Sequence, residues 1–163
     1  MHRGLLMEIL KAYDIPEILM ELIAEIYTGI TAKVVTADGI TEAFDILGGV
    51  LQGDTLAPYL FIIVLDCIMT VAIDDDSENG LTLRPARSRR IGSQKLADVE
   101  FADDVALITD TIEGAKLLLD RLEIAAQSVG LVMNCSKTKF MTLNIPEEIG
   151  WKRSTTLFTL ELG

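Results

Sequence analysis

Residues 95–109 read KLADVEFADDVALIT, and this stretch decides the fold of the chain around it. Two strand-like runs, Lys95 to Glu100 and Val105 to Thr109, flank Phe101-Ala102-Asp103-Asp104, so the pattern predicts a β-hairpin with two carboxylates at its tip. Adjacent aspartates repel each other and resist burial unless a cation or hydrogen-bond donors compensate them. The hairpin tip therefore has the character of a metal site, and an ordinary Asp-rich turn is the alternative.

Two further motifs lie on either side of this hairpin. Upstream, residues 48–61 read GGVLQGDTLAPYLF, and downstream, residues 130–139 read GLVMNCSKTK. Taken alone, the Gln52-Gly53 pair predicts no more than a turn, and Lys137 no more than a surface lysine. The hairpin and the two flanking motifs are very improbable as a chance combination in this order and at this spacing, so we interpret the three together.

In this order, the three segments resemble the B, C and D motifs of reverse transcriptases, most closely those of the non-LTR retrotransposon type. The resemblance extends from Met1 to about Leu143 and implies an RNA-directed DNA polymerase that carries out template-directed, two-metal nucleotidyl transfer. In that family, the strand with the first catalytic aspartate is followed directly by His-Arg. Because this chain opens with Met1-His2-Arg3, we expect it to lack that strand and to be inactive by itself.

The resemblance also implies roles for single residues. Asp103 would be a direct ligand of Mg²⁺ and Asp104 a secondary one, with weak binding because the partner aspartate is missing. Gln52 and Gly53 would form a turn before a long helix, where glycine lets the backbone approach a nucleotide or a template base. Lys137 would approach the incoming triphosphate and act as a general acid toward pyrophosphate.

The charge is unevenly distributed along the chain. The net charge is −11, and residues 1–80 hold 14 acidic against 3 basic residues, whereas residues 81–163 hold 11 of each. This balance argues against strong independent binding of nucleic acid, since such domains usually carry a positive footprint. A basic run before the hairpin could still follow a phosphate backbone or be a solvated loop; it contains Arg84, Arg87, Arg89, Arg90 and Lys95. We assign Arg87, Arg89 and Arg90 to template or nucleotide binding.

The composition fits a globular intracellular protein. With 163 residues and 50% apolar content, the chain fits one domain with a real core. Cys67 and Cys135 lack metal-site spacing, so we expect reduced thiols and no disulfide. His2 is the sole histidine, which excludes a histidine metal cluster and a Ser-His-Asp hydrolase. The apolar run from Leu56 to Ile73 contains Pro58 and Asp66, which favours a buried helix over a membrane span.

The remaining pattern predicts an α+β fold, with helices on one face of a mainly antiparallel sheet, as in the polymerase palm that the resemblance implies. A first helix is expected over Leu5–Tyr13, and a second from Pro16 to a cap at Gly29. One face of the second helix would carry Ile18, Leu19, Leu22, Ile23 and Ile26. A third, long apolar helix follows the Gln52-Gly53 turn and is expected to end at Ile73. An Asp110–Glu113 capping box begins a further helix, whose expected buried stripe is Ile112, Ala115, Leu119, Leu122, Ala126 and Val129. Strands are expected over Thr31–Thr36, Thr41–Ile46, Leu81–Leu83, Leu131–Met133 and Lys139–Leu143.

Residues 1–145 are interpreted as a partial palm domain and residues 146–163 as a C-terminal tail. Loss of the first strand would leave Val99 to Phe101 or Val105 to Ile108 as an open apolar edge. Either two copies pair there as a homo-oligomer, or Thr155 to Leu162 folds back as a replacement strand.

Two functions follow from this interpretation. The first is a retrotransposon polymerase fragment, whose parent binds an RNA template and a DNA primer that the fragment binds weakly or not at all. The alternative is a non-catalytic, co-opted module that keeps the palm fold and self-associates or binds other proteins. A membrane-associated helix is a distant third, and we expect no membrane partner.

Overall fold

The structure is a computed structural model, and it describes residues 2–51, 53–73, 79–87, 92–144 and 154–161. The chain divides into two compact units, Met1–Val64 and Leu65–Gly163. Helix α3 (Ala57–Ile73) contributes residues to both units.

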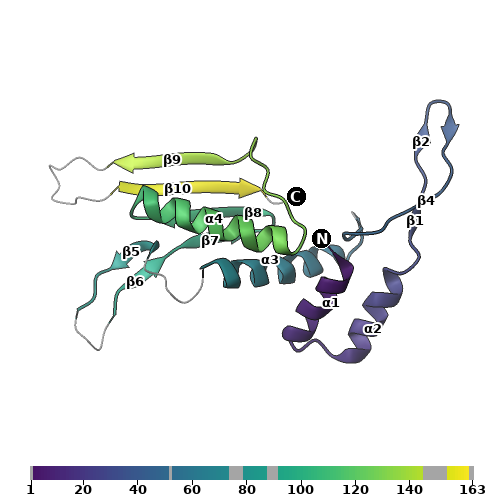
Figure 1. The fold of residues 1–163 in the computed structure, drawn as a ribbon, viewed down its shortest axis with the longest axis horizontal. Coiled ribbons are helices and arrows are strands. Elements are labelled where there is room, and N and C mark those ends of the chain that lie inside the picture. The colour runs from purple at the N-terminus through teal and green to yellow at the C-terminus, as the bar shows by residue number, and fades with distance from the viewer. Residues whose placement is uncertain (1, 52, 74–78, 88–91, 145–153, 162–163) are drawn as a thin grey trace. The chain divides into compact units, whose positions relative to one another are not determined.

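The first unit is built on two short helices and a β-hairpin (Figure 1). Helices α1 (Arg3–Ala12) and α2 (Glu17–Ile26) pack against each other. The predicted hairpin is confirmed but broken into two short antiparallel ladders. Its strands are β1 (Thr31–Ala32), β2 (Val35–Thr36), β3 (Gly39–Ile40) and β4 (Phe44–Asp45).

The apolar face predicted for α2 is mostly solvent-exposed. Of the five residues on that face, Ile23 alone is buried. The exposed members are Ile18, Leu19, Leu22 and Ile26. Gly29 has the expected left-handed backbone (φ +65°), but Tyr27 is the residue that caps the helix.

The second unit is dominated by a four-stranded antiparallel sheet in the order β7-β8-β10-β9 (Figure 1). A separate antiparallel pair, β5 and β6, precedes it. The elements are β5 (Leu81–Arg84), β6 (Gln94–Leu96), β7 (Asp98–Phe101), β8 (Asp104–Thr109), α4 (Ile112–Ser128), β9 (Lys139–Asn144) and β10 (Ser154–Glu161).

One face of this sheet forms the core of the second unit. Helix α4 packs on β8 and β10, and Val105, Leu107 and Thr109 are buried, while the alternate residues of β8 are more exposed. The fold is therefore an α+β mixture with α4 on one face, as predicted. The buried stripe of α4 contains Ala115, Leu122, Ala126 and Val129 as expected, but Leu118 and Ala125 are buried instead of Leu119 and Ile112.

The predicted cap of α4 is wrong by one residue. The side chain of Thr111 accepts a hydrogen bond from the Gly114 N–H (3.0 Å), so Thr111 is the N-cap. Asp110 instead accepts from the backbone N–H and the hydroxyl of Thr82, at 3.1 and 2.9 Å. A carboxylate committed to the neighbouring strand is not available to cap the helix.

The strand predicted over Leu131–Met133 is reduced to a single β-bridge position at Met133. The Leu131 N–H donates to the Ala126 carbonyl (2.9 Å) and the Gly130 N–H to Gln127 (3.0 Å), with Gly130 at φ +76°. This is the hydrogen-bond pattern that closes the end of a helix. The start of the predicted strand is therefore used to end α4.

The tail supplies a strand to the middle of the sheet. Strand β10 pairs with β8 on one side, from Thr156↔Thr109 to Glu161↔Asp104, and with β9 on the other. This is the replacement strand that was predicted as the alternative to edge-to-edge association, and it covers the β8 edge within one chain. No helix among the described residues is long and apolar enough to cross a membrane. Cys67 and Cys135 are free thiols.

Candidate active site

The two adjacent aspartates lie where the sequence predicts, at the end of the β7–β8 hairpin. Ala102 and Asp103 form the two-residue turn, and the Phe101↔Asp104 pair closes it. Ala102 has φ +54°, because a tight hairpin turn of this kind needs a left-handed residue. That conformation costs a residue with a side chain roughly 1–2 kcal/mol. Strain is thus concentrated beside the two carboxylates.

Asp103 and Asp104 are both exposed but occupy different positions. Asp103 lies in the turn, whereas Asp104 is the first residue of β8. The side chain of Asp104 is exposed and that of the next residue, Val105, is buried. Asp104 lines an open hollow of about 290 Å³ on the hairpin, together with Val99, Phe101, Val105 and Ala106. Phe101 is 82% exposed there, so an aromatic ring lies open to solvent near a carboxylate.

A second acidic group lies on the same hairpin. Burial raises the pKa of Glu100 to about 7, with further contributions from a hydrogen bond with Asp98 and from the charges of Asp98 and Asp66. Glu100 and Asp98 alternate with Val99 and Phe101 along β7, so they belong to the other face of the hairpin. Neither is among the residues that line the hollow with Asp104.

The number of metal ligands in the structure is limited. Within the described part of the chain, no group of three or more His, Cys, Asp or Glu residues comes together to hold a metal ion. The register places Glu161 of β10 opposite Asp104. Asp103 and Asp104 remain the candidate ligands.

The Gly53 turn belongs to the first unit and precedes α3. The Asp54 N–H donates to the Leu51 carbonyl (3.1 Å), and Gly53 has φ +90°, which a residue with a side chain rarely adopts. Apart from Gly53 and its two neighbours in the chain, no atom of the described residues lies within 4 Å of where a Cβ on Gly53 would be, so the backbone and not crowding requires glycine. Gln52 lies outside the described residues.

Lys137 lies in a turn of the second unit, just before β9. Asn134 organises this turn: its carbonyl accepts from the N–H groups of Lys137 and Thr138, both at 3.0 Å, and its side chain accepts from Ser136. The Lys137 side chain is exposed. The structure thus supports the motif as a defined turn whose lysine faces solvent.

The basic run is only partly described. Arg84 ends β5 and pairs with Gln94 of β6, and Arg87 is exposed in the segment that follows β5. Arg89 and Arg90 lie outside the described residues.

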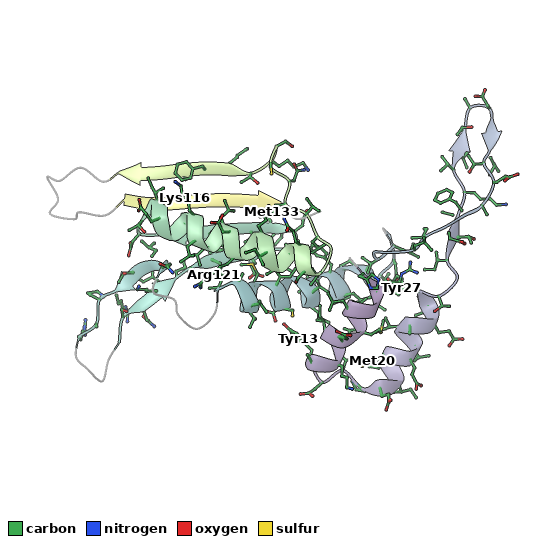
Figure 2. The ribbon with its side chains drawn as sticks, viewed as in Figure 1. Tyr13, Met20, Tyr27, Lys116, Arg121 and Met133 are labelled. Atoms are coloured by element: carbon green, nitrogen blue, oxygen red, sulfur yellow. The ribbon has the colours of Figure 1, made fainter. Side chains whose placement is uncertain are left out.

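Sequence patterns did not reveal a hydrogen-bonded cluster in the first unit. The Tyr27 hydroxyl donates to Asp54 Oδ2 (2.5 Å), and Arg3 Nη1 donates to the Tyr27 carbonyl (2.6 Å). Figure 2 shows Tyr27 next to the end of α2. These partners are 24 and 27 residues apart, so no local pattern could indicate them.

Comparison with known proteins defines the class to which this fold and hairpin belong. Residues 3–159 match the family described as reverse transcriptase (RNA-dependent DNA polymerase), and the chain therefore belongs to the reverse transcriptase family.

Its relatives include polyproteins of R2 retrotransposable elements. The chain is 35% identical over 95 residues to the retrovirus-related Pol polyprotein from type-1 retrotransposable element R2 of Nasonia vitripennis, covering 58% of this chain. It is 30% identical over 129 residues, or 78% of this chain, to the Pol polyprotein from type-2 retrotransposable element R2DM of Drosophila melanogaster. The matches span 8% and 11% of those two relatives. The chain thus matches only a small part of the length of these two relatives.

Proposed function

We propose that this chain forms part of the palm of a retrotransposon RNA-directed DNA polymerase and carries two of its metal-binding carboxylates. The observation that carries the proposal is the strained hairpin, whose turn holds Asp103 and whose first strand residue is Asp104, beside an open aromatic hollow. Residues 1–145 supply the palm region in this interpretation. The strand β10 adds to its sheet from the tail.

The carboxylates of Asp103 and Asp104 fit a partial Mg²⁺ site. Mg²⁺ prefers oxygen ligands and is usually held by one or two carboxylates, with waters and substrate phosphates completing its shell. Bound divalent cations in such a site neutralise charge on the phosphates and activate the attacking hydroxyl. With no third ligand of this kind among the described side chains, we expect weak binding.

Other residues of the chain would contact nucleotide, template and primer. Gly53 leaves open space above a fixed turn, which suits close approach by a nucleotide or a template base, and Gln52 adjoins it. The solvent-facing Lys137 suits contact with a triphosphate and proton donation to pyrophosphate. The basic run with Arg87, Arg89 and Arg90 would contact the phosphate backbone.

Primer extension tests the proposal in two settings. The isolated chain, given an RNA template, a DNA primer and Mg²⁺, should incorporate no more nucleotide than its Asp103→Ala, Asp104→Ala double variant, because an incomplete carboxylate cage loses most of its catalysis. The 129 residues of this chain that align with the Drosophila R2DM relative should then replace their counterpart in that polyprotein. We expect that chimera to extend primers and Asp103→Asn to abolish the extension. A folded chimera that binds primer–template but is inactive would contradict the proposal.

A non-catalytic binding module is the second candidate. It is favoured by the acidic excess in residues 1–80 and by the exposed apolar side chains Ile18, Leu22 and Ile26 on α2. An inactive chimera together with no affinity of the isolated chain for primer–template would support this candidate.

A further inference from the structure

Two residues from other segments of the first unit, Arg3 and Asp54, converge on Tyr27. Tyr27 itself caps α2 and is only 2% exposed. Arg3, at the start of α1, donates to the Tyr27 carbonyl and lies with its guanidinium carbon 5.7 Å from the centre of the Tyr27 ring. The Tyr27 hydroxyl in turn donates to Asp54, which precedes α3. The contacts therefore link the start of α1, the end of α2 and the segment before α3.

Asp54 uses three of its polar atoms in this arrangement. Its backbone N–H closes the turn that contains Gly53 by donating to the Leu51 carbonyl (3.1 Å). Oδ1 accepts the Leu56 N–H (3.1 Å), and Oδ2 accepts the Tyr27 hydroxyl (2.5 Å). The side chain that fixes the start of α3 thus belongs to the residue that closes the Gly53 turn.

Packing alone does not explain why the residue at position 3 is an arginine. Its Nε and Nη2 atoms are buried without a hydrogen-bond partner among the described residues, which costs free energy that a methionine of similar length would not incur. What the guanidinium does contact is the carbonyl and the ring of Tyr27. Arg3 therefore holds Tyr27 in place at a cost to stability.

We propose that Arg3, Tyr27 and Asp54 are positioning residues that hold the Gly53 turn in the one conformation able to meet a nucleotide or a template base. This inference rests on the role proposed above for Gly53. The free space beside Gly53 is useful for recognition only if the turn does not move, and a buried tyrosine with one strong acceptor provides that rigidity.

The protonation states of the pair agree with this role. Burial and the hydrogen bond with Asp54 raise the pKa of Tyr27 to about 12, so the phenol stays a donor. The hydrogen bond from Tyr27, followed by that from the Leu56 N–H, lowers the pKa of Asp54, so the carboxylate stays an acceptor.

The test compares Tyr27→Phe with Tyr59→Phe in the full chain, because Tyr59 is 68% exposed and undergoes the same chemical change. Tyr27→Phe should speed amide exchange at Asp54 and Leu56 roughly tenfold and raise the NMR-measured pKa of the Asp54 carboxyl toward its ordinary value. Tyr59→Phe should change neither. Asp54→Asn should restore part of the Leu56 protection that Asp54→Ala loses. Unchanged exchange and an unchanged Asp54 pKa in Tyr27→Phe would overturn the proposal.

A binding arm separates this proposal from the proposed function. Affinity for a primer–template duplex with Mg²⁺ and the matching nucleotide is measured for the wild-type chimera and for Tyr27→Phe in it. Where Tyr27→Phe speeds amide exchange and the wild-type chimera binds primer–template, Tyr27→Phe should weaken that binding about tenfold. Equal affinities of the variant and the wild-type chimera would overturn the positioning role. If the wild type shows no binding, the proposed function fails, and the nucleotide-positioning role fails with it even though the exchange result defines the turn's rigidity.

Discussion

At the scale of single residues, Ala102 is the one non-glycine residue with a left-handed backbone in the described part of the second unit. Its φ of +54° is that of a glycine position, in the turn that holds Asp103. Replacing it with glycine removes a strain of roughly 1–2 kcal/mol but adds about 0.5–1 kcal/mol of freedom to the unfolded chain.

We therefore expect Ala102→Gly to raise the free energy of unfolding by about 0.5–1 kcal/mol, the difference between these opposing effects. Urea denaturation would measure it. Ala106→Gly, in the β8 strand, is the matched control and should be destabilising because no strain is relieved there. If Ala102→Gly is as destabilising as the control, the strain at the turn is not real.

Glu100 makes the stability of the second unit depend on pH. Its folded-state pKa of about 7 lies above the ordinary value of 4.5, so folding favours the protonated form. The contribution to stability is fully present below pH 4.5 and is lost as the pH rises through 7.

Glu100→Gln should consequently gain stability relative to the wild type as the pH is raised. Thermal unfolding at pH 5 and at pH 8 checks this, with a larger difference in Tm between variant and wild type expected at pH 8. The same difference at both values would mean that Glu100 titrates normally.

Residue identities at the candidate site were predictable where they follow local rules. The pair Asp103 and Asp104 was predictable because flanking strand patterns locate a hairpin tip, and Gly53 because a turn before a helix favours glycine. The roles of Tyr27 and Arg3 were not, because they depend on contacts between segments far apart in sequence. The shifted pKa of Glu100 was not predictable either, because its largest cause is burial, which depends on the folded structure.

At the scale of elements, α4 shows the limits of periodicity. Several choices of stripe fit its sequence, and only packing on β8 and β10 decides that Leu118 and Ala125 are buried. The strand expected after α4 is reduced to a bridge at Met133 for a related reason, since closing the helix used the N–H groups of Gly130 and Leu131.

Two leucines of α4 provide a direct test of the observed stripe. Leu118 is 2% exposed, so Leu118→Ala should cost about 2–5 kcal/mol by leaving a cavity against the sheet. Leu117 is 42% exposed, and Leu117→Ala should cost about 1 kcal/mol or less. Equilibrium denaturation of the two variants decides between them: similar losses would mean that α4 is rotated from the observed orientation.

At the scale of the whole molecule, the arrangement of the sheet depends on β10. A strand that pairs on both sides removes two edges, whereas β7 and β9 remain as edges, the first with two acidic residues and the second beginning with Lys139. Charged residues on edge strands discourage pairing between molecules. The homo-oligomer expected from an open β8 edge is therefore not needed to satisfy that edge.

Deleting residues 151–163 should expose the edges of β8 and β9 and cause self-association that grows with concentration. Sedimentation over a range of concentrations measures this, and removal of residues 162–163 alone, which lie beyond β10, is the control. A monomeric deletion variant would show that β10 does not protect the sheet.

The position of β10 also sets an order of events during synthesis. The ribosome completes β8, α4 and β9 before it reaches β10, although β10 lies between β8 and β9 in the sheet. Before β10 is synthesised, the facing edges of β8 and β9 have no strand partner. These two strands must therefore leave space between them for β10 to insert. Pairing between strands far apart in sequence forms slowly, and a chain whose strand edges are still unpaired is prone to aggregate. The nascent chain is thus most in need of a chaperone in the interval between the emergence of β9 and that of β10.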